Sequence, residues 1–523
     1  MQKAWMPVVG LGALSAAGCL TPWYTPPPAG IVRELLPPAA NPPGPVAESL
    51  PVAPATRAGK PPAPLKTTGT LELTDVLQSV DQGFPLLLAI HEERTIASGQ
   101  RLAAEGFFDT NVSTRNIVSE GTYSNNRVDV LVEQALPMYG ISVFGGYRKS
   151  SGDFPSYYGD RKTAEAGELR GGFMLPVLRN GPIDRGRASL RQAQISENLA
   201  DPVIQAARIG FLRAGAVAYW SWVAAGERYH VEDALLKLAR DRQEFIDKIV
   251  KAGNRPELEA IDNRRSIAER EGRLIAAERS LQQAAITLSL YYRDSEGHPV
   301  VPGAQQLPSN LRQLKPMQPK SELIKQDIET AFVNRPEMNR FALLKERVAI
   351  DLQLAENSNL PTLNGALLGS QELGKGKPTA GSPFDEGGVE ASFLLSMPLQ
   401  FRQARGEQQR YRGILMQLQM QEQFQRENIG AEVQDAVSSL DRAYARILRA
   451  RDEADIAARV VSLEKKRFEE GAATVLEVNL RELAAADAQR RVVDALADYF
   501  RATADYRAAL GLDASQPLEP QAK

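Results

Sequence analysis

The three histidines of this chain are the side chains best suited to acid–base or metal chemistry, and their spacing supports neither. His91, His230 and His298 are scattered along the sequence, whereas a zinc-protease helix places two histidines four residues apart. The stretch HEER at His91 lacks that second histidine, and the sequence contains no glycine-rich phosphate loop. We therefore expect no catalytic residue, no metal site and no cofactor, and we predict that the chain is not an enzyme.

Cys19 is the only cysteine of the chain, so no disulfide bond can form within it. It follows a basic residue, Lys3, then an apolar run and small residues, which is the pattern of a secretory signal. This position resembles the lipobox of bacterial lipoproteins, although Ala16 stands where that motif usually has leucine. We predict a lipoprotein signal peptide over residues 1–18 and acylation of Cys19. An ordinary secreted protein with an unrelated thiol is the alternative.

The net charge argues against nucleic acid as a partner, and the proline content marks an N-terminal tether. The formal net charge is −2, so there is no basic excess to neutralise nucleic acid, and we expect none to bind. Residues 20–68 hold fourteen of the 34 prolines, a composition typical of an extended tether without a core. We assign the tether to residues 19–69. Beyond the signal segment, no apolar run reaches the length of a transmembrane helix.

From residue 70 onward the sequence falls into two similar halves, which indicates an internal repeat. Each half begins with a helix interrupted by a proline, continues to strands that end at another proline, and closes with a long helix, a glycine and a returning helix. The matched pairs are Pro85 and Pro336, Pro176 and Pro398, and Gly253 and Gly471. The first half carries roughly thirty extra residues before its second proline. These extra residues form a longer hairpin, a surface loop or an additional pair of strands.

The predicted strands before Pro176 and Pro398 alternate between apolar and polar residues. In the second half, Val389, Ala391, Phe393 and Leu395 share one face, opposite Glu390. The first half places its residues in the same way: Leu169, Phe173 and Leu175 lie opposite Glu168 and Arg170. A strand of a membrane barrel and a strand of a soluble sandwich both show this pattern.

The helices carry a coiled-coil spacing. Apolar residues recur in steps of four and three, and the sequence has no proline between Pro398 and Pro517. A helix over 402–470 would be ~100 Å long, and the returning helix over 474–511 only ~57 Å. The predicted helices at 70–106 and 319–358 are about as long as the difference. We therefore expect one short helix to stack on each short arm and match the long arm beside it.

This order of parts resembles the TolC family of outer-membrane efflux ducts over roughly residues 70–511. The resemblance is strongest in MPLQFRQARGEQQR and in the closing hairpin that begins RFEEGAATVLEV. It implies a mainly α, α+β fold with two structural repeats and a homotrimeric assembly. Each protomer would supply four strands to a shared 12-stranded transmembrane β-barrel, and its helices to a long coiled-coil cylinder.

The resemblance also implies a function, partners and a location. The protein would be the passive exit duct of a tripartite efflux or type I secretion system. Its partners would be its own copies, a periplasmic adaptor protein, an inner-membrane pump of the proton-driven RND or ATP-driven ABC class, and outer-membrane lipid. It would reside in the outer membrane, with a lipid anchor and a periplasmic helical domain. The alternative is a lipid-anchored periplasmic coiled-coil scaffold that forms no pore.

In this family the glycine turns are the periplasmic tips, where the tunnel closes and the adaptor docks. The resemblance therefore assigns adaptor contact to the two turns, and a gate to the acids beyond them and to one aromatic residue. The turn residues are Gly253, Asn254, Arg255, Gly471, Ala472 and Ala473. The gate residues are Glu259, Asp262, Glu477 and Phe468. Leu480 stands where a further acid would be expected, and Ala473 where a basic partner is sometimes found, a role that Arg255 would take over.

Together these features give a domain plan. The first repeat covers residues 70–300, a linker covers 301–318, and the second repeat covers 319–511. The tail is 512–523.

Overall fold

The structure, a computed structural model, describes residues 69–154, 162–308, 311–319, 321–375 and 387–513. The chain divides into two units, Met1–Gly59 and Lys60–Lys523, and the elements below all belong to the second. The predicted signal peptide, Cys19 and the tether as far as residue 68 lie outside the described residues, as does the tail from residue 514.

The helices occur in the same order in the two halves, and each half ends in a pair of long helices. The first half contains α1 (Leu73–Gly83), α2 (Pro85–His91), α3 (Glu93–Glu105), α4 (Arg185–Lys251) and α5 (Glu257–Ser289). The second half contains α6 (Ile324–Asn334), α7 (Pro336–Asn357), α8 (Arg402–Glu469) and α9 (Val475–Ala509). Helices α8 and α9 confirm the two arms predicted from the coiled-coil spacing. Among the described residues, no helix combines the length and the apolar character needed to cross a membrane.

The two prolines near the start of the halves explain why the short helices are interrupted. Pro85 is the first residue of α2 and Pro336 the first residue of α7. The residues before them, Phe84 and Arg335, have extended backbones with ψ of 117° and 120°. A proline favours such a conformation in its predecessor and has no N–H to donate, so one helix ends and a new one begins.

The described residues contain one antiparallel sheet of six strands in chain order. The strands are β1 (Asn111–Ser119), β2 (Asn125–Ala135), β3 (Ser142–Gly152), β4 (Glu168–Pro176), β5 (Thr362–Glu372) and β6 (Gly388–Ser396). The prediction of four strands per protomer is therefore wrong. The extra residues of the first half form an additional pair of strands, β2 and β3, inserted between the two strands that have counterparts in the second half.

The pairing register sorts the side chains of this sheet into two faces. Val112 lies beside Val132, Val130 beside Tyr147, and Phe173 beside Leu367. Most of the side chains on this face are apolar: Val112, Val118, Val128, Val130, Val132, Val143, Tyr147, Leu169, Phe173, Leu175, Leu363, Leu367, Val389, Ala391, Phe393 and Leu395. The polar exceptions are Thr114, Asn116, Asn126, Gln134, Lys149, Ser151 and Gln371. We call this side of the sheet the apolar face. The other, the polar face, carries all the acidic side chains of the sheet and most of its basic ones: Arg115, Arg127, Asp129, Glu133, Arg148, Glu168, Arg170, Glu372 and Glu390, with Asn364, Ser370 and Ser392. Its large apolar exceptions are Ile117, Leu131, Phe144, Met174, Leu368 and Leu394.

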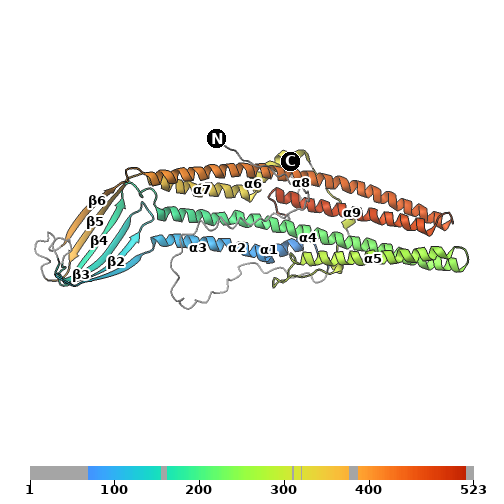
Figure 1. Cartoon of the computed structure of the whole chain (residues 1–523), viewed down its shortest axis with the longest axis horizontal. Coiled ribbons are helices and arrows are strands. Elements are labelled where there is room, and N and C mark those ends of the chain that lie inside the picture. Colours follow the sequence, from blue (N-terminus) through green and yellow to red (C-terminus); the bar gives the residue numbers. More distant parts are fainter. Residues whose placement is uncertain (1–68, 155–161, 309–310, 320, 376–386, 514–523) are drawn as a thin grey trace, which may run out of the picture. The chain divides into compact units, whose positions relative to one another are not determined.

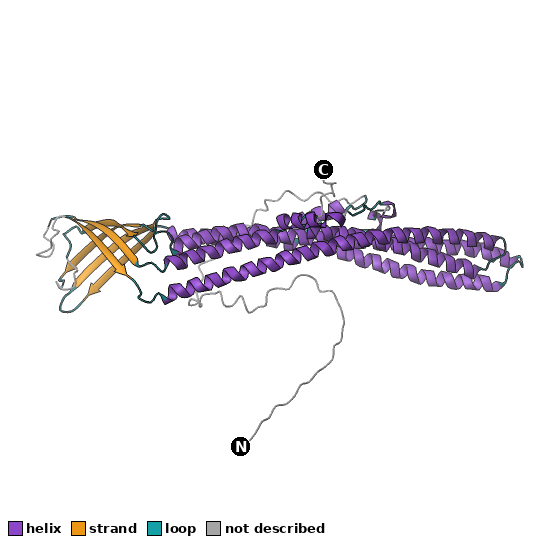
Figure 2. Ribbon diagram, turned by 90° about the horizontal axis from the view of Figure 1, so that it is seen from above, coloured by secondary structure: helices purple, strands orange, loops and turns teal. Residues whose placement is uncertain are grey.

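The helices run lengthwise beside one another, with the sheet at one end (Figures 1 and 2). Helices α6, α7 and α9 pack along α8, and α1, α2, α3 and α5 pack along α4, which confirms that short helices complete each short arm. Helix α4 also contacts α7 and α9 of the other half. The largest buried cluster reflects this contact, because it joins Trp222 of α4 to Ile447 of α8 and Leu496 of α9, all fully buried.

The connection between the halves packs against the middle of the helices. Leu307 and Leu311 are buried in the same cluster as Trp222. Arg312 pairs with the buried Glu227 of α4 at 3.0 Å, and the backbone N–H of Met317 donates to the Tyr499 hydroxyl at 3.1 Å. This segment therefore ties α4 of the first half to α9 of the second.

Candidate functional site

The two turns that end the long hairpins share one backbone geometry. Gly253 and Gly471 have left-handed backbones with φ of +77° and +79°. At the first turn the N–H of Asn254 donates to the carbonyl oxygen of Ile249 at 3.1 Å, and Ala472 makes the equivalent bond at 2.8 Å. This is the Schellman motif, which ends a helix while satisfying its last carbonyl groups. The glycines are needed because residues with a Cβ rarely adopt this conformation.

One side chain, that of Arg255, connects the two turns. Its guanidinium donates to the carbonyl oxygens of Phe468 and Ala473, each at 3.2 Å. It also lies 5.0 Å from the centre of the Phe468 ring, within the range of a cation–π contact. A carboxylate oxygen of Glu259 accepts a further hydrogen bond at 3.1 Å. The structure thus brings four of the predicted site residues together at one point.

Glu259 and Glu477 follow their glycines at the same distance but have different partners. The Glu477 carboxylate accepts hydrogen bonds from the backbone N–H of Thr474 at 2.7 Å and from its hydroxyl at 3.0 Å, which forms a capping box at the start of α9. These bonds hold the pKa of Glu477 below its ordinary value. Pro256 is the N-cap of α5 and has no N–H to donate. Glu259 binds Arg255 instead.

The remaining predicted residues lie close by in different surroundings. Phe468 is only 8% exposed and packs against Ile246 of α4 and Val478 of α9, so its ring holds the two hairpins together. Asp262 is half-buried on α5, one turn beyond Glu259. Asn254, Ala472 and the two glycines are exposed. Cys19 lies outside the described residues.

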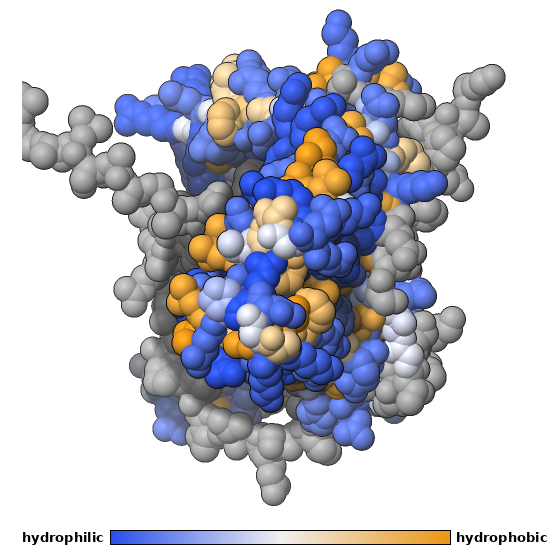
Figure 3. Space-filling view, turned by 90° about the vertical axis from the view of Figure 1, so that its right-hand side faces the viewer, coloured by the Kyte–Doolittle hydropathy of each residue, from blue (hydrophilic) through white to orange (hydrophobic). Residues whose placement is uncertain are grey.

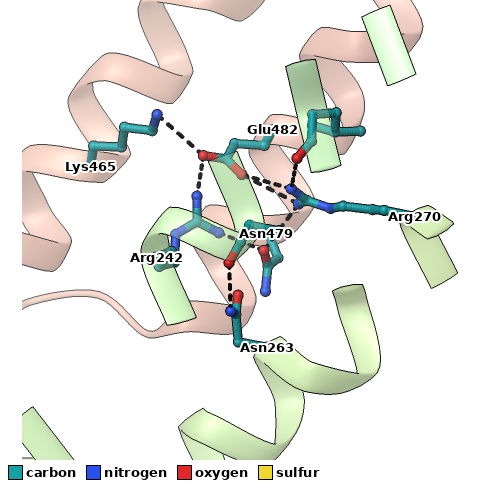
Figure 4. Close-up of polar contacts among 8 residues, drawn as sticks. Arg242, Asn263, Arg270, Lys465, Asn479 and Glu482 are labelled. Atoms are coloured by element: carbon teal, nitrogen blue, oxygen red, sulfur yellow. Dashed lines mark hydrogen bonds and ion pairs between the residues drawn. The ribbon is translucent and has the colours of Figure 1, made fainter. Parts of the chain in front are cut away.

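A buried polar cluster lies on the long helices a few turns from these tips (Figure 4). Its centre is the carboxylate of Glu482 on α9, whose side chain is 2% exposed. It pairs with Arg242 of α4, with Arg270 of α5 at 3.3 Å and with Lys465 of α8 at 3.2 Å. Asn479 accepts hydrogen bonds from the same two arginines at 2.6 and 3.0 Å. One carboxylate therefore links all the long helices named above.

The electrostatics of this cluster are set by three cations that meet one anion. Burial alone would raise the pKa of Glu482, but Arg242 and the other two cations hold it below its ordinary value. Burial also lowers the pKa of Arg270, against the pull of Glu482. The Arg270 side chain is 3% exposed, so water cannot stabilise its charge. Glu482 and the carbonyl oxygen of Leu235, at 2.7 Å, accept its hydrogen bonds in place of water.

Sequence reasoning missed this cluster because its members lie on four separate helices. One signal was present. Glu482 stands midway between Val478 and Ala486 on the face of α9 that packs inward, and both of those residues are buried. A charged residue at a core position of a coiled coil needs a buried partner.

The surface at the tips combines polar and apolar residues. Viewed end-on, it is largely hydrophilic with separate apolar patches (Figure 3). Leu258 and Ile261 near the start of α5 are 65% and 52% exposed, and Leu476 and Leu480 near the start of α9 are 43% and 57% exposed. The first two turns of each returning helix thus present apolar side chains that nothing in the described residues covers.

Solved structures share this arrangement of sheet and helices. VceC, an outer membrane protein of Vibrio cholerae, matches 84% of this chain and 96% of its own with 15% identity and a TM-score of 0.57. The MtrE outer membrane channel of Neisseria gonorrhoeae, in its open state, matches 84% of this chain and 89% of its own, with 14% identity and a TM-score of 0.57. CusC, whose crystal structures concern folding and transmembrane channel formation, matches 88% of this chain and 98% of its own, with 12% identity and a TM-score of 0.61.

The chain has the fold of these outer-membrane channels. No family model matches the sequence, and no curated protein matches it. At these low identities the channel fold rests on architecture: repeated helical hairpins joined to an antiparallel sheet. The matching structures are outer-membrane proteins and channels, and for this chain the likeness establishes the fold.

Replacing Gly471 with alanine should loosen the second tip. A Cβ at this position would meet no neighbouring atom within 4 Å, so the cost comes from the left-handed backbone alone, about 1–2 kcal/mol. Hydrogen–deuterium exchange at residues 465–478 should become about 5- to 30-fold faster. As a control, Gly413→Ala on the exposed surface of α8, which also has open space around it, should stabilise its helix slightly. Unchanged exchange at the tip in Gly471→Ala would contradict the backbone argument.

Glu482→Gln should destabilise the packing of the long helices. It leaves Arg242, Arg270 and Lys465 without a counter-charge, which costs about 3–5 kcal/mol for a buried pair. Thermal unfolding followed by circular dichroism at pH 7 measures the loss. The matched control is Glu453→Gln, because Glu453 pairs with Arg491 at 2.6 Å with both side chains about half exposed. That change should cost less than about 1 kcal/mol.

Comparing the wild-type protein with Glu482→Gln at different pH values tests the charge of Glu482. The pKa of Glu482 is lowered in the folded chain from a reference value of 4.5, so its stabilisation is complete above that value and is lost as the pH falls through the lower folded value. The stability difference between the wild-type protein and Glu482→Gln should therefore shrink at acidic pH. A difference that stays constant from pH 7 to pH 3 would show that the Glu482 charge contributes nothing.

Proposed function

We propose that this protein is the outer-membrane exit duct of a tripartite efflux or type I secretion system. Three copies enclose one tunnel, a periplasmic adaptor protein binds the tips, and an inner-membrane pump, RND or ABC, supplies the energy. The duct itself is passive. The observation that carries the proposal is the two-faced sheet attached to helices far longer than those of a compact domain.

The sheet has the properties of a barrel wall. Its strands are 9 to 11 residues long, which is the length a tilted strand needs to cross a bilayer. In the proposed assembly the apolar face contacts lipid and the polar face lines the water-filled interior.

The helices suit the periplasmic part of the duct. At 1.5 Å per residue, α8 is about 100 Å long, and it ends at the exposed tips. The adaptor would bind there, at Gly253, Asn254 and Arg255 in one turn and at the residues from Gly471 to Ala473 in the other. The exposed apolar side chains on the returning helices support this assignment, because clustered apolar surface marks sites of protein contact.

The gate belongs to the same proposal. In the trimer Glu259, Asp262 and Glu477 would ring the tunnel opening and favour cations. Phe468 and Arg255 would hold it closed by joining the two turns. Support comes from the contacts of Arg255 with Phe468 and Ala473 and from the exposure of Glu477.

A pair of adjacent residues on β6 separates a barrel from a pore-free scaffold. Phe393 lies on the apolar face and Leu394 on the polar face, and they are 76% and 64% exposed. Phe393→Arg should prevent stable insertion, because an arginine facing lipid costs about 2–4 kcal/mol in each copy. Leu394→Arg should insert normally. The yield of heat-modifiable oligomer from purified outer membranes measures both.

The pore-free scaffold predicts a different result when heat-modifiable oligomers are assayed by gel electrophoresis. A lipid-anchored coiled coil without a pore would tolerate both substitutions equally and would show no heat-modifiable species. Equal yields of the two variants would therefore reject the duct.

The lipid anchor is part of the proposal and has its own test. If the Cys19 thiol carries the lipid, metabolic labelling with a fatty acid should mark the wild-type protein and not Cys19→Ala. The barrel should still form in that variant, because the strands need no anchor to pair. Labelled Cys19→Ala protein would exclude acylation at this position.

A further inference from the structure

The side-chain pattern of the β2–β3 hairpin fits two strands of a barrel wall, and does not fit a plug inside the barrel. Val128, Val130 and Val132 of β2 lie on the apolar face, while Arg127 and Asp129 lie on the polar face. Strand β3 continues this sorting, since Val143 and Tyr147 share the apolar face with Phe173 and Leu169 of β4. On this face the apolar residues fill the middle of the hairpin, and Asn126 and Lys149 follow towards its far end. A hairpin folded into a water-filled interior would have no reason to carry such an apolar band on one face.

Contacts on the polar face and at the inner turn fix this hairpin in place. Asp129 accepts hydrogen bonds from Arg127 at 2.7 Å and from Arg148 of the partner strand at 2.6 Å. At the turn between the strands Gly140 has φ of +67°, and a Cβ there would lie 2.7 Å from the carbonyl oxygen of Asn180. The turn is thus packed tightly against the junction of β4 and α4.

The two edge strands are left open for pairing. Strands β1 and β6 are exposed along nearly their whole length. Neither contains a proline or a lysine, and each has a single charged residue, Arg115 or Glu390, which lies on the polar face, so little protects these edges from pairing. Because the described sheet has an even number of antiparallel strands, β1 and β6 run in opposite directions. The β6 edge of one copy can therefore pair antiparallel with the β1 edge of the next.

We propose that the β2–β3 hairpin widens the barrel, so that three copies close into 18 strands in place of 12. This rests on the trimer of the proposed function and adds the size class of the cargo. Barrel diameter grows about linearly with strand number, so the opening would be about 1.5 times as wide as that of a 12-stranded ring. Rings of 16–18 strands leave an aqueous channel. The outer opening then passes large hydrated solutes, and size selection falls to the helix tips.

The test compares the full-length protein with a variant lacking residues 124–163. That deletion removes β2 and β3 together and joins Tyr123 to Ala164, so β1 becomes the antiparallel neighbour of β4 and the apolar face stays continuous. Both proteins are inserted in one direction into planar lipid bilayers, and neutral polyethylene glycols of graded size are added to one side. The largest polymer that still lowers the conductance reports the width of the opening on that side.

From the barrel side, the limiting polymer radius should be about 1.5 times larger for the full-length protein than for the deletion variant. From the tip side the two limits should agree, because the deletion leaves the tips unchanged, and this serves as the internal control. Equal limits from the barrel side would overturn the proposal.

Electron cryomicroscopy of the full-length trimer decides the matter if the deletion variant fails to assemble. Eighteen strands in one closed ring support the proposal. A conducting trimer with 12 wall strands, or with the hairpin outside the wall, overturns it while leaving the exit duct intact. A protein that neither conducts nor forms trimers overturns the exit duct itself and this proposal with it.

Discussion

The two halves of this chain depend on burying their apolar surfaces against each other. Each half alone is a long hairpin with a short helix beside it, and its inward stripe would stay in water. The contact of α4 with α9 buries that surface around Trp222 and Leu496. Ion pairs accompany the contact along its length, from Arg213 with Asp505 to Arg242 with Glu482. The strands, the tips and the connecting segment all take their positions from helices aligned in this way.

The interactions change in character along that alignment. The middle is held by aromatic and aliphatic packing, and the pairing of Arg228 with Asp494 there is partly exposed. Towards the tips the apolar contacts become smaller, and the buried charges around Glu482 take over much of the connection. Such charges are satisfied in only one arrangement of the helices, since a shift of either hairpin would leave a cation buried without its partner. The tip end is therefore held by interactions that a change in charge can release.

Sequence patterns predicted the parts whose cause is local. The long helices, the interruptions at Pro85 and Pro336 and the turns at Gly253 and Gly471 each follow from the conformational limits of one residue or from a steady spacing. The extra strands β2 and β3 stayed undecided because alternation over a short stretch fits a strand in any sheet, and pairing partners are set by the rest of the wall. Glu482 escaped notice because its partners come from helices remote in sequence. The different roles of Glu259 and Glu477 depend on one neighbour, Pro256 in place of Thr474.

The insertion of a complete hairpin has a consequence for how such proteins diverge. A single added strand would leave two parallel neighbours and reverse the direction in which the chain meets its next helix. Two strands restore both, as β1 and β4 show by keeping the directions of their counterparts β5 and β6. In the proposed trimer, the width of the barrel can therefore change only by one whole hairpin in every subunit at once. Gradual tuning is confined to the side chains that line it.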